Sequence, residues 1–155
     1  MVSIDLLESA EGVVMAQSVQ LPMPTTRQPV VLLVQQRGDG LEMYVEFLRY
    51  SGCAAITASN GTDALMLART ADIIITGIRL DGRTDGVELV SYLRADEGTM
   101  HKPIIVLTAS AWPHVQARAE RAGCNVFLPK PCLPDALLRE VHRLLPHFAL
   151  DTAER

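Results

Sequence analysis

The chain has 155 residues, a mass of 16.9 kDa, a formal net charge of −4 and a pI of about 5.5. Hydrophobic residues make up 48% and charged residues 21%, which is the balance of a globular domain and excludes a disordered tail, a collagen-like repeat or a coiled-coil rod. The basic residues form no block and no apolar run reaches the length of a membrane helix, so we expect neither a nucleic-acid surface nor a membrane span. Three cysteines without metal-ligand spacing, and no secretory signal, favour a cytoplasmic protein.

The two ends of the chain differ from its middle. Residues 1–29 contain Pro22 and Pro24 close together, and a glycine interrupts any helical pattern before them, so we expect a flexible N-terminal arm. Residues 147–155 are predicted to be a short C-terminal tail. Because this tail is too short for a DNA-binding or catalytic module, we expect the function to come from the surface of the middle domain, residues 30–146.

In the middle domain, short β-branched runs alternate with amphipathic stretches. The predicted strands cover residues 30–34, 54–58, 72–76, 104–108 and 125–128, and the predicted helices cover residues 41–51, 87–95, 113–122 and 134–145 and a stretch capped by Thr62 that ends at Arg69. Continuous apolar strands that alternate with helices are typical of a parallel sheet covered on both faces. The pattern therefore predicts an α/β fold with a doubly wound, five-stranded parallel sheet and five helices.

Ligands of such folds bind at the carboxyl ends of the strands, so the residues just after each strand are the candidate site. These residues are Gln35, Gln36, Gly77, Thr108, Ala109 and Lys130. Residues around them carry a resemblance: VLTAS at 106–110, FLPKP at 127–131, DIIITGIRL at 72–80 and DGVEL at 85–89. Over residues 30–145 the chain resembles a receiver domain of a two-component response regulator, which implies the flavodoxin-like, three-layer form of this fold.

The resemblance also implies a chemistry whose residues are half missing here. In receiver domains an Asp after the third strand accepts a phosphoryl group from a histidine kinase, two acidic residues after the first strand hold Mg²⁺ with it, and a Thr or Ser and a Lys contact the phosphoryl oxygens. In this chain Gly77 stands at the acceptor position and Gln35 and Gln36 stand at the acidic pair, while Thr108 and Lys130 remain. We therefore expect no aspartyl phosphate at position 77, no useful Mg²⁺ affinity, no other cofactor and no enzymatic activity. A glycine introduced on purpose is an alternative, but the simultaneous loss of the acidic pair favours natural divergence.

Three nearby carboxylates are candidates for a substitute acceptor. Asp85 fits the cap of the following helix, Asp81 lies four residues beyond Gly77, and Asp39 can reach only the rim. None of them is expected to rescue phosphorylation.

Lys130 would lie in a pocket suited to an anion, and three arrangements are open: it turns to solvent, it binds Thr108 and backbone carbonyls, or it holds a free anion. The resemblance also places Phe127 at the aromatic switch position of the family and implies a cis peptide bond between Lys130 and Pro131.

The leading hypothesis is a stand-alone, degenerate pseudo-receiver that signals by binding proteins without phosphorylation. The partners would be a histidine kinase, a phosphotransfer protein or a downstream regulator, or a second copy bound through the fourth helix, fifth strand and fifth helix. On this partner face we expect Trp112, Arg118, Arg121, Arg139 and Arg143. The alternatives are a phosphorelay component with a non-standard acceptor and a sensor that binds a small anion or molecule in the vacated pocket.

Overall fold

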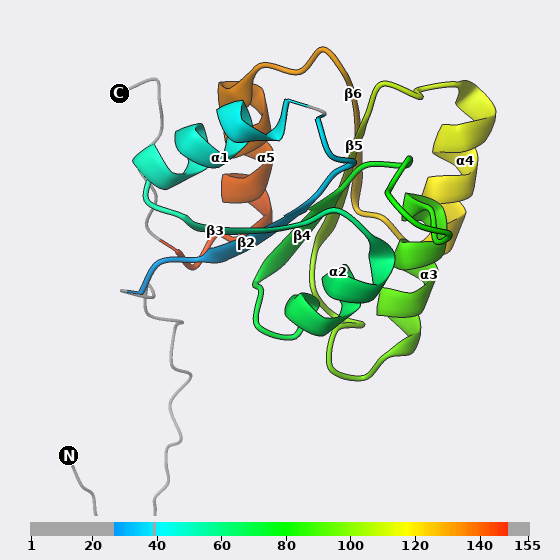
Figure 1. Cartoon of the computed structure of the whole chain (residues 1–155). Helices are drawn as coiled ribbons and strands as arrows, with labels where there is room; N and C mark the ends of the chain where they lie inside the picture. Colours follow the sequence, from blue (N-terminus) through cyan, green and yellow to red (C-terminus); the bar gives the residue numbers. More distant parts are fainter. Residues whose placement is uncertain (1–26, 39, 149–155) are drawn as a thin grey trace, which may run out of the picture.

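The computed structural model describes residues 27–38 and 40–148, which form a three-layer α/β domain (Figure 1). Its elements are β2 (Val30–Val34), α1 (Leu41–Tyr50), β3 (Ala54–Ala58), α2 (Gly61–Ala68), β4 (Ile73–Thr76), α3 (Gly86–Ala95), β5 (Ile104–Thr108), α4 (Pro113–Ala122), β6 (Val126–Pro129) and α5 (Pro134–Leu144). The five strands are parallel and lie in the order β3-β2-β4-β5-β6. The doubly wound fold predicted from the sequence is confirmed.

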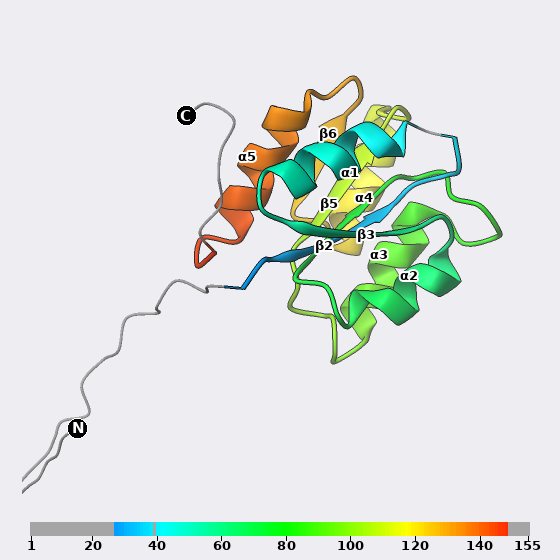
Figure 2. The ribbon, with the colours of Figure 1, turned by 60° about the vertical axis from the view of Figure 1, so that its left-hand side comes forward.

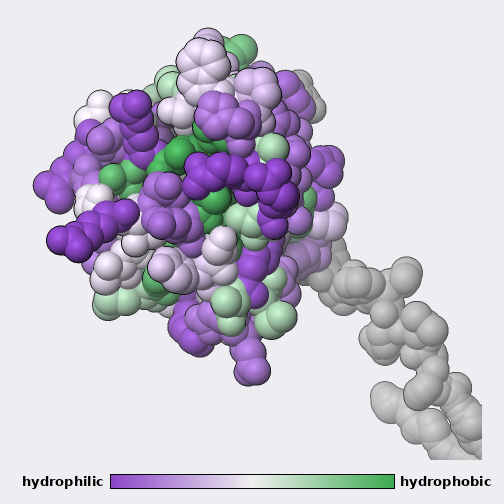
Figure 3. Space-filling view, turned by 90° about the vertical axis from the view of Figure 1, so that its right-hand side faces the viewer, coloured by the Kyte–Doolittle hydropathy of each residue, from purple (hydrophilic) through white to green (hydrophobic). Residues whose placement is uncertain are grey.

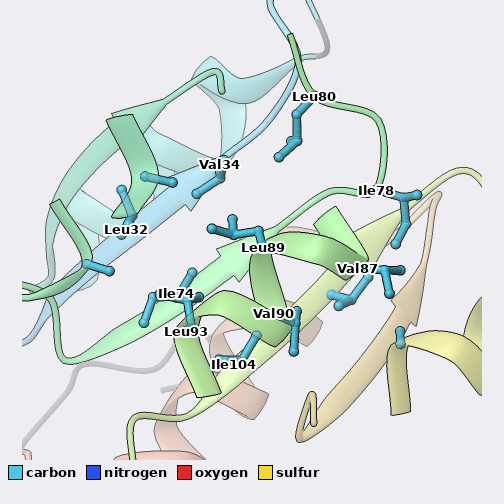
Figure 4. Close-up of a cluster of buried hydrophobic side chains, with 14 of the residues drawn as sticks. Leu32, Val34, Ile74, Ile78, Leu80, Val87, Leu89, Val90, Leu93 and Ile104 are labelled. Atoms are coloured by element: carbon cyan, nitrogen blue, oxygen red, sulfur yellow. The ribbon is translucent and has the colours of Figure 1, made fainter. Parts of the chain in front are cut away.

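Two hydrophobic cores lie on opposite faces of the sheet. Helices α1 and α5 cover one face, and α2, α3 and α4 cover the other (Figure 2). Leu32, Ile74 and Leu89 belong to the core under α3 (Figure 4), whereas Ile105 and Leu137 belong to the core under α5. Because successive strand residues point to opposite faces, burial on both faces explains the continuous apolar runs in the sequence.

Side-chain caps fix the starts of two helices. The Asn60 side chain accepts a hydrogen bond from the Asp63 amide at 2.8 Å and begins α2. The cap predicted at Thr62 is therefore wrong by two residues, because Asn60 already satisfies an amide of the first turn. Asp85 begins α3 in a capping box, in which its carboxylate accepts from the Glu88 amide and Glu88 accepts from the Asp85 amide, both at 2.9 Å.

The loop after β4 folds tightly back on the end of its own strand. The Gly86 amide donates to the Ile78 carbonyl at 2.7 Å, and a Cβ atom at position 86 would overlap the carbonyl oxygen of Gly77. Only glycine permits this approach. The loop therefore packs its backbone against Gly77 and leads directly into α3.

Contacts beyond the predicted bounds extend the domain at both ends. The Arg27 guanidinium makes two hydrogen bonds to the Asp72 carboxylate, at 2.8 and 2.9 Å, and lies 5.1 Å from the centre of the Phe148 ring. Phe148 is only 3% exposed and packs in the core under α5. The sequence assigns Arg27 to the arm and Phe148 to the tail, and the structure packs both on the domain. Residues 1–26 of the predicted arm and residues 149–155 of the predicted tail lie outside the described residues.

Candidate functional site

The carboxyl ends of β2, β4 and β5 surround a cavity of about 310 Å³. It is lined by Gln35, Gln36, Gly77, Ile78, Arg79, Leu107, Thr108, Ala109 and Ser110. The sheet thus brings together five of the six residues predicted after the strands, and the sixth, Lys130, reaches the cavity through a hydrogen bond to Gln35. Among the described residues of this lining no carboxylate is present, and Arg79 is the one charged residue.

Gln35 is the most buried polar side chain of the cavity, with 2% of its surface exposed. Its Nε2 donates to the carbonyl of Leu107 at 3.3 Å, and its Oε1 accepts from Lys130 Nζ at 3.0 Å. The neighbouring Gln36 is exposed. The two glutamines at the acidic-pair positions therefore differ: the first is an internal hydrogen-bonding group and the second lies at the surface.

Gly77 leaves room for the Gln35 amide. The Gly77 backbone amide donates to the Val34 carbonyl at 2.8 Å, which holds the end of β4 beside β2. A Cβ atom at position 77 would lie 3.2 Å from Gln35 Oε1 and 3.4 Å from its Cδ and Nε2. These separations are tighter than ordinary contacts, so a larger residue at 77 would require Gln35 to move.

The side chain of Thr108 is buried, and its hydroxyl accepts a hydrogen bond from the Ser110 amide at 2.9 Å. Its carbonyl accepts from the Lys130 amide at 2.9 Å, which continues the β5–β6 ladder up to the site. Ala109, between Thr108 and Ser110 in the sequence, is exposed and lines the cavity. The backbone thus fixes Lys130 beside Thr108.

The ammonium group of Lys130 binds the Gln35 amide oxygen, a contact that the three arrangements considered from the sequence do not include. A neutral amide just after β2 is therefore one acceptor of this ammonium group. The peptide bond between Lys130 and Pro131 is cis, the isomer that the resemblance implies. Phe127 is half-buried and packs against the core on the side of α2, α3 and α4.

The described carboxylates considered as substitute acceptors are engaged elsewhere. Asp81 forms an ion pair with Arg37 at 3.1 Å, and its amide donates to the Ser59 carbonyl beside β3. Asp85 is committed to the capping box of α3. Asp39 lies outside the described residues. Within residues 27–38 and 40–148, no three His, Cys, Asp or Glu side chains come together as metal ligands.

The predicted partner residues lie around the β6 edge of the sheet, where α4 and α5 flank the strand from opposite faces. Trp112 is 66% exposed before α4, and the four arginines are exposed. Three of them form ion pairs: Arg118 of α4 with Asp85 at the start of α3, and, within α5, Arg139 with Asp135 and Arg143 with Glu140. Figure 3 views the molecule from the right-hand side of Figure 1, where hydrophilic side chains surround a smaller hydrophobic area. No helix in the described part of the chain is long and apolar enough to cross a membrane.

A parallel sheet in this order, with a polar cavity at its carboxyl edge between β2, β4 and β5, defines a flavodoxin-like signalling fold of the receiver class. The family model of the response regulator receiver domain matches residues 31–142. The chain belongs to this family, and it is a receiver domain of two-component signalling.

Relatives and solved structures agree with this assignment. The chain is 30% identical, over 103 residues, to the polar-differentiation response regulator DivK of Brucella anthropi, covering 65% of this chain and 83% of that protein. The chemotaxis response regulator CheY4 of Vibrio cholerae superposes with a TM-score of 0.69 at 28% identity, covering 76% of this chain and 99% of that one. The receiver domain of a sensor histidine kinase from Pseudomonas aeruginosa, solved with a magnesium ion in its active-site cleft, gives a TM-score of 0.70 at 28% identity, covering 77% and 98%.

Proposed function

We propose that this receiver domain acts in two-component signalling as a degenerate pseudo-receiver, by protein–protein interaction and without phosphorylation at position 77. The observation that carries the proposal is the pairing of Gly77 with Gln35. Position 77 has no nucleophile, and the space beside it is occupied by an amide that already binds Lys130. Transfer of a phosphoryl group needs a nucleophilic oxygen and a charge-neutralising metal, and the described residues of the lining include no carboxylate that could serve as nucleophile or metal ligand.

The domain would then act as a binding module without Mg²⁺, and not as an enzyme. Its partner would be another signalling protein, bound through the exposed surface around α4, β6 and α5. Trp112 supports this choice, because a large aromatic side chain that is mostly exposed is typical of interface anchors. The exposed arginines of α4 and α5 would form the polar rim of such an interface.

Intact mass spectrometry after incubation with acetyl phosphate and Mg²⁺ tests the proposal. The unsubstituted chain is expected to gain no phosphoryl group. A variant carrying Gln35→Asp, Gln36→Asp and Gly77→Asp is expected to gain one, because it restores the three carboxylates and removes the amide that would obstruct a side chain at 77.

A matched variant separates the acceptors. Gly77→Asp alone is expected to react less than the triple variant, because Gln35 still crowds position 77 and no acidic pair is present to hold Mg²⁺. A phosphoryl adduct on the unsubstituted chain would contradict the proposal and favour a phosphorelay role. Loss of that adduct in Asp81→Asn, Asp85→Asn or Asp39→Asn would then identify the acceptor.

A further inference from the structure

The Gln35 side chain connects the ends of three strands that are not all neighbours. Gln35 follows β2, its amide nitrogen binds a carbonyl of β5, and its amide oxygen binds Lys130, which follows β6. In the sheet, β4 lies between β2 and β5. The amide must therefore pass over the end of β4, which is the place where Gly77 has no side chain.

The glycine at position 77 and the glutamine at position 35 are thus complementary. Glycine at 77 opens the path across β4, and a glutamine at 35 is long enough to use it and carries both a donor and an acceptor. A carboxylate at 35 would keep the acceptor for Lys130 but lose the donor to Leu107. A side chain at 77 would push against all three outer atoms of the amide.

The Gln35 oxygen also occupies a defined electrostatic position. Gln35 is almost completely buried and its oxygen faces an ammonium group, in a cavity whose described lining residues include no carboxylate. Lys130 is bound to the Gln35 oxygen just outside the lining residues, so an oxyanion that replaced this oxygen would meet the same ammonium group. Since the amide is covalently tethered beside Lys130, it competes with a free anion at a high effective concentration.

We propose that Gln35 is an internal ligand of the receiver cavity: its amide bridges Lys130 and β5 across Gly77, holds the ends of β2, β5 and β6 in one arrangement, and keeps free oxyanions from Lys130. This inference rests on the proposed function, which it deepens by naming what replaces the phosphoryl group. It also gives a role to Gln35 and to Gly77, the two buried residues that differ from the receiver pattern. Gln35 is a positioning residue in this account, since it acts through Lys130.

The chain offers a direct test, because Lys102 and Lys130 are its only lysines. With nitrogen-15 lysine, the side-chain ammonium spectrum contains one signal from the site and one from Lys102, which donates to three backbone carbonyls at the other edge of the sheet. In Gln35→Ala we expect the Lys130 signal to shift and its hydrogen exchange to accelerate by about tenfold or more, the factor that a hydrogen bond to a charged group provides. The Lys102 signal should stay in place, which confirms that the variant is folded.

Gln36→Ala is the matched control, because it removes an exposed glutamine one residue away and should leave both lysine signals unchanged. Inorganic phosphate is then added to each protein. In Gln35→Ala the Lys130 signal should move with millimolar phosphate, and in the unsubstituted chain it should not.

Three results would overturn the inference. The first is a Lys130 signal that stays unchanged in Gln35→Ala, and the second is a Lys130 signal in that variant that does not shift when phosphate is added. The third is a Lys130 signal in the unsubstituted chain that shifts with phosphate as much as it does in Gln35→Ala. Each of them leaves the proposed function standing if acetyl phosphate still adds nothing to the unsubstituted chain. A covalent adduct there would reject the proposed function whatever the lysine spectra show.

Discussion

The two lysines of this chain lie at opposite edges of the sheet, and the two edges are held together in different ways. At the amino edge Lys102 donates to the carbonyls of Ala68, Arg69 and Ala71, at 2.6 to 3.0 Å. At the carboxyl edge Lys130 binds the amide of Gln35, beside an open cavity. Lys102 binds backbone carbonyls at the end of a helix, whereas Lys130 binds a side-chain acceptor that a single substitution can remove.

Arginines repeat the contrast. Arg94, at the end of α3, donates to the carbonyls of Gly123, Met100 and Lys102 and to the side chain of Asn125. Near the cavity, Arg79 is exposed and Arg37 pairs with Asp81 at the surface. We therefore expect the charged side chains at the amino edge to contribute more to the stability of the fold than those at the carboxyl edge.

The largest expected effect is at the amino edge. Arg94→Ala should lower the free energy of unfolding by about 3 kcal/mol, because it leaves partly buried carbonyls without a charged donor. Urea denaturation monitored by circular dichroism measures this. Arg121→Ala, an exposed arginine of α4, should change it by less than about 0.5 kcal/mol. Equal losses in the two variants would remove the stabilising role assigned to this edge.

At the carboxyl edge the corresponding loss should be smaller. Gln35→Met retains the approximate volume of the side chain but lacks both hydrogen-bonding groups, and should cost about 1–2 kcal/mol of unfolding free energy. Gln36→Met should be nearly neutral, since that side chain is exposed. The same denaturation series compares them. If Gln35→Met cost as much as Arg94→Ala, the carboxyl edge would be as structural as the amino edge.

Much of the fold could be predicted from the sequence, because each strand is a continuous apolar run and most helices begin or end at a recognisable residue. Pro113 and Pro134 each occupy the first turn of a helix, and Asp85 caps α3, all as expected. The start of α2 differs from the prediction, because Asn60 is the cap and lies two residues before Thr62. Phe148 was placed in the tail because a single aromatic residue after a helix-ending proline gives no periodic signal.

The candidate site was predicted by position but not by contact. The carboxyl ends of the strands and the resemblance locate Gln35, Gly77 and Lys130. The hydrogen bond between Gln35 and Lys130 joins residues 95 apart in sequence, and no local pattern encodes it. The network of Arg94 was missed for the same reason, because its acceptors are mainly backbone carbonyls, which every residue type carries.

The stability that the Asp72 carboxylate contributes at the amino edge should depend on pH. Burial raises the pKa of the Asp72 carboxyl, but the hydrogen bonds from Arg27 and from the Val30 amide outweigh this effect, and the pKa lies below its usual value. A lowered pKa in the folded state stabilises the fold above the carboxyl's unfolded pKa of about 4, and this stabilisation is lost as the pH falls through the folded value.

Asp72→Asn should therefore lower the melting temperature at neutral pH, and its difference from the unsubstituted chain should shrink as the solution is acidified. Thermal denaturation from pH 7 down to about pH 3 measures both trends. A difference that grows on acidification would show that the carboxylate is not stabilised by these contacts.

The smallest effects concern the three thiols. Cys53 and Cys124 lie before β3 and β6, at the amino edge, and burial raises the pKa of each to about 11. At pH 8 only about a thousandth of such a thiol is ionised, so both should react slowly with iodoacetamide. Cys132 follows β6 at the carboxyl edge, where burial also raises its pKa, but it is more accessible than the buried Cys53.

We therefore expect alkylation to occur first at Cys132 and last at Cys53, as measured by peptide mass spectrometry, with all three reacting together in urea. Modification of Cys53 before Cys132 in the folded protein would contradict the tighter packing of the amino edge.

The amide of Gln35 fills the space beside Gly77, and we propose that the cavity therefore does not respond to a phosphoryl group. Beryllium fluoride with Mg²⁺ mimics a phosphoryl group on a receiver carboxylate, and the backbone amide spectrum reports any rearrangement of residues 104–112 and 126–134. For the unsubstituted chain we predict no shift of these signals, and for the variant with Asp at 35, 36 and 77 we predict a shift in both segments. Shifts of both segments in the unsubstituted chain would contradict the account, because they would show a cavity that still binds and responds to the phosphoryl mimic.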